Sequence, residues 1–255
     1  RATKSPEFRT DLGFTTENNW IRDDLWQRYE YRGTGLVRSA NARFNASVSH
    51  NYNNQLLQQE YGINFNLDLA NQMEFGFGYE NNVKVMFEEY NFKNFSDYNF
   101  NATYSPSGNF YFRLGYSAGE GIARNIDTPS IGDRENYNLS TRYQFTDEFN
   151  VRLQYRYNSL SDQITKEDYF AGYVTSVRAT YQFNKDSFIR VVHEYNDFNN
   201  DSYTQALFQW QPDSATIFYI GGTINQEDIE STWVREGSQI YMKLQYLFNF
   251  DWMYF

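Results

Sequence analysis

The sequence predicts an all-β protein, an antiparallel up-and-down transmembrane β-barrel with about 14 strands. Three observations predict this fold. Aromatic residues make up 20% of the 255-residue chain, although its mean hydropathy is only −0.76. Apolar and polar residues alternate with a period of two in segment after segment, which indicates strands with one apolar face. These segments are long enough to cross a bilayer at a tilt, which takes about 9–11 residues.

Alternation and short turns define the strands in the N-terminal half. In the segment 61–69, Ile63 and Phe65 take one side and Asn64 and Asn66 the other. Turn-forming residues such as Gly33 separate these segments, because glycine and its polar neighbours favour tight turns. The predicted strands are 7–14, 24–32, 37–49, 57–69, 73–87, 96–105 and 109–118.

The C-terminal half continues the same pattern. In 149–158, Leu153 and Tyr155 alternate with Arg152 and Arg156. The segment 215–224 alternates poorly, so the pattern does not show which of its side chains lie on which face of the sheet. The predicted strands are 134–145, 149–158, 169–183, 186–196, 203–211, 215–224 and 237–250.

The connections between these strands alternate in length, with short turns followed by longer loops. Outer-membrane barrels have short periplasmic turns and longer extracellular loops. We therefore expect a single barrel over residues 1–255 in the outer membrane of a Gram-negative bacterium, with both chain ends periplasmic. The longer predicted loops are 15–23, 50–56, 88–95, 119–133, 159–168, 197–202 and 225–236.

Aromatic residues gather near the ends of the predicted strands. Their rings favour the headgroup level of a membrane, with the apolar body in lipid and the polar tip in water. We expect a girdle that contacts outer-membrane lipid, whereas a soluble β-sandwich or solenoid is the alternative. The predicted girdle consists of Tyr104, Phe110, Tyr143, Phe145, Phe149, Tyr181, Phe183 and Trp210.

Composition argues against several other classes of protein. No run of about 18 apolar residues occurs, as a transmembrane helix would need. The net charge of −10 disfavours binding to nucleic acid, which needs a basic surface. With two histidines and no cysteine, a zinc or haem site is not expected. Asp197, Asn199 and Asp201 match the opening of a calcium loop, but Phe208 stands where the loop needs a glutamate, so an acidic surface loop is expected there instead. The sequence therefore predicts no metal site and no cofactor.

Five segments carry a resemblance to a known family: SPEFRTDLGF at 5–14, SFIRV at 187–191, FQWQP at 208–212, FYIGG at 218–222 and YMKLQYLF at 241–248. Together they resemble the C-terminal outer-membrane barrel of a large, poorly characterised family. Its members carry an N-terminal module similar to family 9 carbohydrate-binding domains. The resemblance implies location more than activity. It also implies that this chain is the C-terminal part of a longer protein.

Charged residues occupy the polar side of the alternating pattern, where we expect them to face the lumen. In a closed barrel the arginines and most of the acids would form opposite walls. Such walls would create a field that orients polar or anionic solutes. Alternatively, arginines and acids pair with one another and plug a narrow lumen. The residues are Arg113, Arg142, Arg152, Arg156, Arg178, Arg190, Glu30, Asp68, Glu74, Glu80 and Glu194.

Two functional hypotheses follow. The first is an anchor or docking scaffold for a periplasmic or surface module, or for other outer-membrane or surface proteins. The second is a diffusion channel or uptake port for polar or glycan solutes. Gly76 and Gly78, which share the polar side of one strand, are expected to relieve crowding inside the barrel.

An outer-membrane hydrolase is a distant third hypothesis. Residues 115–119 fit the G-x-S-x-G nucleophile motif, which needs a strand, a sharp turn and then a helix. The residues after Gly119 lack helical periodicity. Ser117 takes the polar side of its strand, whereas His193 shares the side of Val191. We therefore predict no catalytic residues and no enzyme activity.

Overall fold

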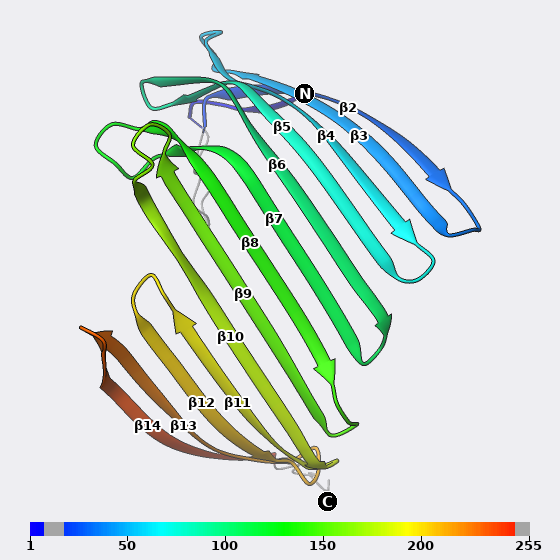
Figure 1. Cartoon of the computed structure of the whole chain (residues 1–255), viewed down its shortest axis with the longest axis vertical. Helices are drawn as coiled ribbons and strands as arrows, with labels where there is room; N and C mark the ends of the chain where they lie inside the picture. Colours follow the sequence, from blue (N-terminus) through cyan, green and yellow to red (C-terminus); the bar gives the residue numbers. More distant parts are fainter. Residues whose placement is uncertain (8–17, 248–255) are drawn as a thin grey trace, which may run out of the picture. The chain divides into compact units, whose positions relative to one another are not determined.

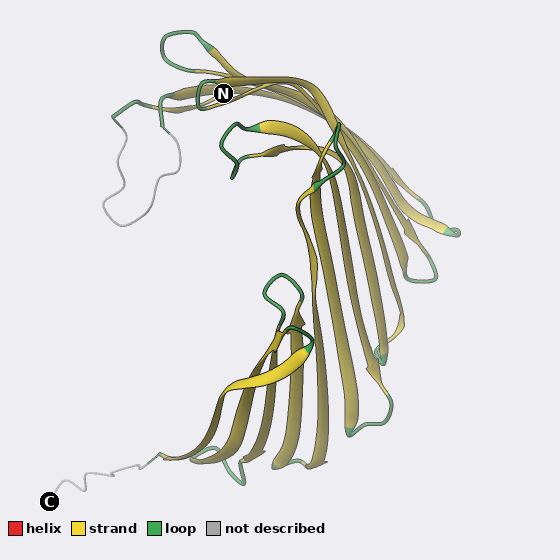
Figure 2. Ribbon diagram, turned by 60° about the vertical axis from the view of Figure 1, so that its left-hand side comes forward, coloured by secondary structure: helices red, strands yellow, loops and turns green. Residues whose placement is uncertain are grey.

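In the computed structural model, residues 1–7 and 18–247 are described, and they contain strands and no helix (Figures 1 and 2). The strands are β1 Ala2–Lys4, β2 Trp20–Arg32, β3 Val37–His50, β4 Leu56–Leu69, β5 Met73–Phe87, β6 Tyr90–Ser107, β7 Phe110–Ala123, β8 Ser130–Gln144, β9 Phe149–Asp162, β10 Asp168–Asn184, β11 Ser187–Asn196, β12 Asp201–Trp210, β13 Thr216–Ile229 and β14 Thr232–Tyr246. No helix in this part of the chain could span a membrane.

The strands follow one another in a single hydrogen-bonded order from β1 to β14. Each strand pairs with its neighbours in the chain, and connections of two to six residues join β2 through β14. Connections this short can join only antiparallel strands, because parallel neighbours need a crossover. The predicted all-β class, with about 14 antiparallel strands in up-and-down order, is confirmed for the described residues, and the closure of this sheet into a transmembrane barrel stays a prediction.

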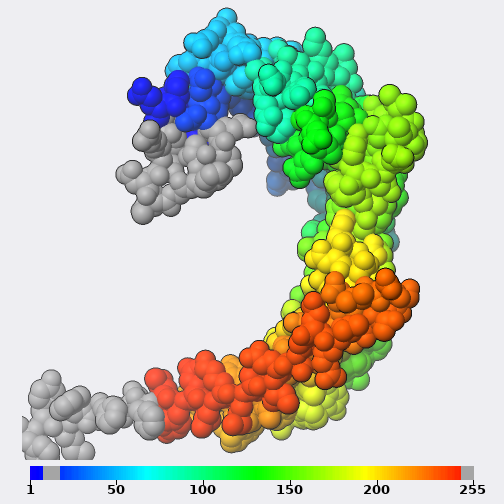
Figure 3. Space-filling model, turned by 90° about the vertical axis from the view of Figure 1, so that its left-hand side faces the viewer, coloured from blue at the N-terminus to red at the C-terminus, as the bar shows by residue number. Residues whose placement is uncertain are grey.

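The chain divides into two compact units. Unit 1 comprises Arg1–Pro106, Leu114–Tyr137 and Asn158–Ala171. Unit 2 comprises Ser107–Arg113, Asn138–Tyr157 and Gly172–Phe255. Strands β1 to β6 belong almost wholly to unit 1, and strands β11 to β14, yellow to red in Figure 3, to unit 2.

The predicted contrast between short turns and long loops is wrong. Residues 90–95, predicted as part of a loop, belong to β6 and pair with β5 up to Phe87, opposite Tyr90. This pairing gives the backbone N–H and C=O groups of the hairpin their hydrogen-bond partners, and Phe92 and Phe95 are buried in the same segment. The periplasmic position of the chain ends was inferred from the loop contrast, and it stays a prediction.

The last hairpin is also longer than predicted. Strands β13 and β14 continue through the predicted loop 225–236 and turn at Glu230 and Ser231 alone. Both residues have positive φ angles, 51° and 65°, as a two-residue hairpin turn requires. Most of the predicted strand 7–14 lies outside the described residues, and β1, at Ala2–Lys4, was not predicted.

Alternation gives each unit one polar and one apolar face. On β4, Asn64 and Asn66 share a face with their partners Gly78 and Gly76, whereas Phe65 pairs with Phe77 on the other face. Few side chains are buried in a single-layered sheet. Among the described residues the buried apolar side chains are Phe92, Phe95, Ala123, Leu160 and Leu207, and many large apolar side chains are exposed.

Candidate functional site

The polar face of unit 1 holds the four predicted acids that belong to this unit. Asp68 lies directly opposite Glu74, and Glu80 lies opposite Asp97. The pairing of β2 with β3, and of β3 with β4, places the side chain of Glu30 on the same face. The structure therefore places Glu30, Asp68, Glu74 and Glu80 on one face, as the alternation predicted.

Asparagines and glycines alternate across the middle of this face. Asn66 donates a hydrogen bond to Asn41 at 3.2 Å, and Asn64 donates one to Asn45 at 3.3 Å. A Cβ atom at Gly76 would lie 2.3 Å from the amide nitrogen of Asn101, and one at Gly78 would lie 2.4 Å from that of Asn99. The asparagine side chains thus lie across glycines of neighbouring strands. This confirms that Gly76 and Gly78 relieve crowding.

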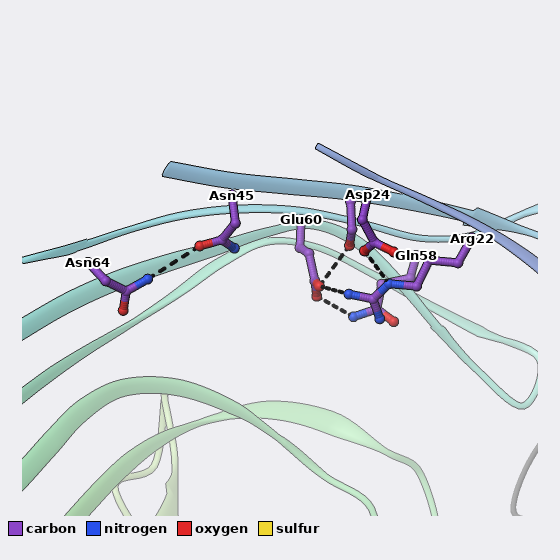
Figure 4. A network of polar contacts seen from close by, with 7 residues as sticks. Arg22, Asp24, Asn45, Gln58, Glu60 and Asn64 are labelled. Atoms are coloured by element: carbon purple, nitrogen blue, oxygen red, sulfur yellow. Dashed lines mark hydrogen bonds and ion pairs between the residues drawn. The ribbon is translucent and has the colours of Figure 1, made fainter. Parts of the chain in front are cut away.

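A charged network lies beside these amides (Figure 4). Glu60 accepts hydrogen bonds from Arg22 at 2.9 Å, from Ser47 at 2.8 Å and from Gln58. Arg22 also donates to Asp24 at 2.8 Å. The side chain of Glu60 is only 13% exposed, and a largely buried charge of this kind needs such partners. This network was not predicted from the sequence, because its members come from segments that are far apart in the chain.

Two of the predicted acids of unit 1 have partners on the same face. Glu30 forms ion pairs with Arg32 at 2.9 Å and with Arg28 at 3.4 Å. Asp68 accepts a hydrogen bond from Ser39. The spacing Arg28, Glu30, Arg32 puts all three side chains on one side of the strand, so the sequence already contained this signal. Of the predicted acids of unit 1, Glu30 is thus paired with arginine, whereas Asp68 is held by a neutral hydroxyl.

A pocket of about 530 Å³ opens on the same polar face between β2, β3 and β4. Trp26 is an exposed aromatic residue in its lining, and the guanidinium carbon of Arg43 lies 5.8 Å from the centre of its ring. Asn41, Asn64 and Asn66 complete much of the wall. An aromatic face beside amide and guanidinium groups suits a polar solute that also has an apolar side.

The polar face of unit 2 is rich in arginine. Arg178 lies opposite Val192 and Arg190 opposite Thr180, so these two arginines share a face. Arg152 joins them in one pocket of about 350 Å³. Arg113, Arg142 and Arg156 are on β7, β8 and β9, outside this pocket.

These arginines differ from those of unit 1 in their partners. Within the described part of unit 2, none of five arginines has an ion pair or a hydrogen bond to a carboxylate: Arg142, Arg152, Arg156, Arg178 and Arg190. Glu194 lies on the same face, opposite Ser176, but it makes no ion pair with them there. Mutual neutralisation of Glu194 and the arginines is therefore not observed in unit 2.

The predicted aromatic girdle is a continuous series of ring contacts in unit 2. The distances between successive ring centres are 6.1 Å for Phe110 and Tyr143, and 6.4 Å for Phe149 and Tyr181. Trp210 is exposed on the same face, two positions from Phe208, whereas Tyr104 lies in unit 1 opposite Met73. The contacts run in the order Phe110, Tyr143, Phe145, Phe149, Tyr181, Phe183 and Phe208.

A second aromatic row crosses the same face of unit 2 and was not predicted as a row. Tyr155, Tyr173, Tyr195 and Trp233 form ring contacts with centres 5.4, 5.6 and 6.0 Å apart. The two rows lie six to eight residues apart along β9 and β10, which is about 20–26 Å of strand. With a strand tilt of about 35–45°, this spacing covers most of the apolar band of an outer-membrane barrel.

Short apolar side chains, such as those of Val177 and Val191, fill the band between the two rows. His193 is a polar residue in this band, and its Nδ1 lies 2.9 Å from the hydroxyl of its cross-strand partner Thr204. A polar group can lie among apolar neighbours when it is hydrogen-bonded in this way.

The G-x-S-x-G segment does not form a nucleophile elbow. Strand β7 runs through it from Phe110 to Ala123, and no helix follows among the described residues. Ser117 accepts a hydrogen bond from the amide of Asn136 at 3.0 Å. Gly119 has a φ angle of 150°, and a Cβ atom there would lie 2.3 Å from the carbonyl oxygen of Ser96. The close approach of β6 and β7 therefore explains the glycine at 119.

Comparisons with known proteins give distant similarities. No protein-family model and no curated protein matches the chain. A KdgM porin in complex with disordered oligogalacturonate is similar over 90% of this chain and 100% of its own, at 14% identity and a TM-score of 0.32. The CymD monoaromatic hydrocarbon channel is similar over 90% and 88%, at 9% identity and a TM-score of 0.33. The toluene transporter TodX of Pseudomonas putida is similar over 88% and 86%, at 9% identity and a TM-score of 0.32.

Among the described residues, no group of three or more His, Cys, Asp or Glu side chains is arranged to hold a metal ion. The charged network and the two pockets described above make the polar faces of the two units the candidate functional surfaces of this chain.

Proposed function

We propose that this chain forms the wall of a β-barrel in the bacterial outer membrane and acts as a diffusion channel for polar solutes. Its apolar face contacts lipid, and its polar face lines a water-filled passage. The two aromatic rows of unit 2 support the lipid contact, because they bracket a band of short apolar side chains.

This proposal rests on the observation that asparagine side chains lie flat against the sheet on the polar face of unit 1. Gly62, Gly76 and Gly78 leave room for asparagine side chains to lie across the sheet. Barrels of about eight strands fill their interior with side chains, whereas barrels of about 16–18 strands leave an aqueous channel. A wall of flat-lying amides leaves the passage open and offers hydrogen bonds along it. The pocket beside Trp26 adds a place where a passing solute can make contact.

Thiol labelling combined with single-channel recording tests the proposal. The chain has no cysteine, so one introduced thiol is the only target. We expect planar bilayers containing the Asn66→Cys variant to show unitary currents. A charged, water-soluble thiosulfonate should then reduce these currents, because Asn66 lies on the polar face.

Phe65→Cys is the matched control, since Phe65 is the adjacent residue on the apolar face. Its currents should not change with the reagent, because the thiol lies in lipid. Absence of current from a folded, reconstituted protein contradicts the proposal and favours an anchor. Equal responses of the two variants contradict the assignment of the faces.

A further inference from the structure

We infer that Arg152, Arg178 and Arg190 form a binding site for an oxyanion, meaning a carboxylate, phosphate or sulfate group carried by a solute. This inference deepens the proposed function and rests on it, because the polar face must be open to solutes. The three arginines come from the adjacent strands β9, β10 and β11. Such a site would select among polar solutes by charge.

The pocket contains hydrogen-bonding groups besides the three guanidinium groups. Asn150, Thr180 and Gln182 belong to its lining, and Phe188 forms an apolar part of it. Its volume is about 350 Å³, within the range of small-molecule sites. The guanidinium groups, together with neutral amide and hydroxyl groups, can donate hydrogen bonds to the several lone pairs of an oxyanion.

The charge of the site is not balanced within unit 2. Arg152, Arg178 and Arg190 make no ion pair among the described residues of this unit. Glu194, the acid on the same face of β11, is four residues from Arg190, or about 13 Å along the strand. Clustered cations without a carboxylate repel one another, so a bound anion would stabilise the cluster.

Arg190 gives a second and independent indication. Its Nε is buried and has no hydrogen-bond partner. Buried donors almost always have an acceptor, and an unsatisfied one lowers stability. On its own strand Arg190 lies between Phe188 and Val192, and across β12 it faces the buried Leu207. These apolar neighbours strengthen an electrostatic bond to an anion, because they keep water away from it.

The planar fork of arginine binds two oxygens of one oxyanion at once, which a lysine ammonium cannot do with the same geometry. Arg190 would hold the anion through the two terminal nitrogens of its guanidinium group, and Arg152 and Arg178, which are more exposed, would complete the charge. The site therefore fits a solute that carries at least one oxyanion, with room beside it for the rest of the molecule.

Calorimetric titration of the folded protein in detergent micelles tests this site, with inorganic phosphate and citrate as probes in a fixed chloride background. We expect saturable binding by the unaltered protein. Binding should weaken by about tenfold or more in Arg190→Gln, which loses charge-assisted hydrogen bonds. Arg190→Lys should also weaken it, because the fork is lost. Tighter binding of phosphate or of citrate would identify the preferred oxyanion.

Arg142→Gln is the matched control, since Arg142 is an unpaired arginine of the same unit outside the pocket. Its affinity should stay close to that of the unaltered protein, and a melting curve for each variant would confirm folding. Absence of saturable binding, or equal weakening in Arg142→Gln, overturns the site. Binding without unitary current contradicts the channel and leaves the site standing, whereas current without saturable binding contradicts the site alone.

Discussion

The two units present polar faces of different chemistry. In unit 1, acids lie beside arginines on the same face, as Glu60 does with Arg22 and Glu30 with Arg32. In unit 2, arginines such as Arg152 and Arg178 have no carboxylate partner among the described residues of that unit. A paired charge contributes to the stability of the sheet. An unpaired charge that faces water contributes little to stability and instead attracts ions of the opposite sign.

The comparison predicts that unit 2 controls ion selectivity, and this is the largest effect that we expect. Arg178→Glu combined with Arg190→Glu should change the preference of the channel from anions to cations. The ratio of anion to cation permeability should fall on the order of tenfold, because the sign of the local field is reversed. The reversal potential across a bilayer with a KCl gradient measures this ratio.

A charge swap in unit 1 is the matched control. Arg28→Glu combined with Glu30→Arg exchanges two paired residues and leaves the net charge of the face unchanged. Selectivity should therefore stay as it is in the unaltered protein. If the swap moves the reversal potential as far as the double variant in unit 2, the difference between the two faces does not control selectivity.

The comparison also predicts that removal of a charge affects the stability of unit 1 more than that of unit 2. Glu60→Gln replaces the acceptor of Arg22, Ser47 and Gln58 and should lower the free energy of unfolding by about 1–3 kcal/mol. Arg156→Gln removes a side chain without such a partner, and its effect should stay within about 0.5 kcal/mol. Urea unfolding in detergent micelles measures both values. Equal losses would mean that Arg156 is as well paired as Glu60.

Much of this difference between the units could not be predicted from the sequence. Alternation along a single strand gives the face of each side chain, so the polar positions of Glu30 and Arg178 were predicted correctly. Pairing depends on register between strands, which a one-dimensional pattern does not contain. The partners of Glu60 come from three segments, around residues 22, 47 and 58, and only the fold brings them together.

Cross-strand contacts also explain where alternation failed. The segment 215–224 alternates poorly because the four residues at 217–220 are all apolar and Gly221 and Gly222 follow in succession. A Cβ atom at Gly221 would lie 2.7 Å from the ring of Tyr241 on β14, whose hydroxyl accepts a hydrogen bond from Gln205. The glycine makes room for a large residue on the neighbouring strand. Similarly, the second aromatic row was missed because Tyr155, Tyr173 and Tyr195 become neighbours only when the strands align.

The smallest predicted effect concerns turns that hold the hairpins beyond the aromatic rows. Asp162, at the end of β9 in unit 1, accepts hydrogen bonds from the backbone of Thr165 and Ile164 and from the hydroxyl of Tyr169. Backbone donation by Thr165 is the largest cause that lowers the pKa of Asp162 to about 2. In unit 2, Asp213 accepts from two backbone amides in the same way but receives no tyrosine hydroxyl bond.

Because the pKa of Asp162 is lowered in the folded chain, its carboxylate stabilises the turn fully above the ordinary aspartate value of 3.8. This stabilisation is lost as pH falls through about 2. Carbon-13 NMR titration of the carboxyl groups in micelles should show this low value, and Tyr169→Phe should raise it by removing one donor. An ordinary pKa for Asp162, or no response to Tyr169→Phe, would show that these hydrogen bonds do not hold the turn in solution. In that case the turns would not share the difference between charges that are paired within the fold and charges that are open to solutes.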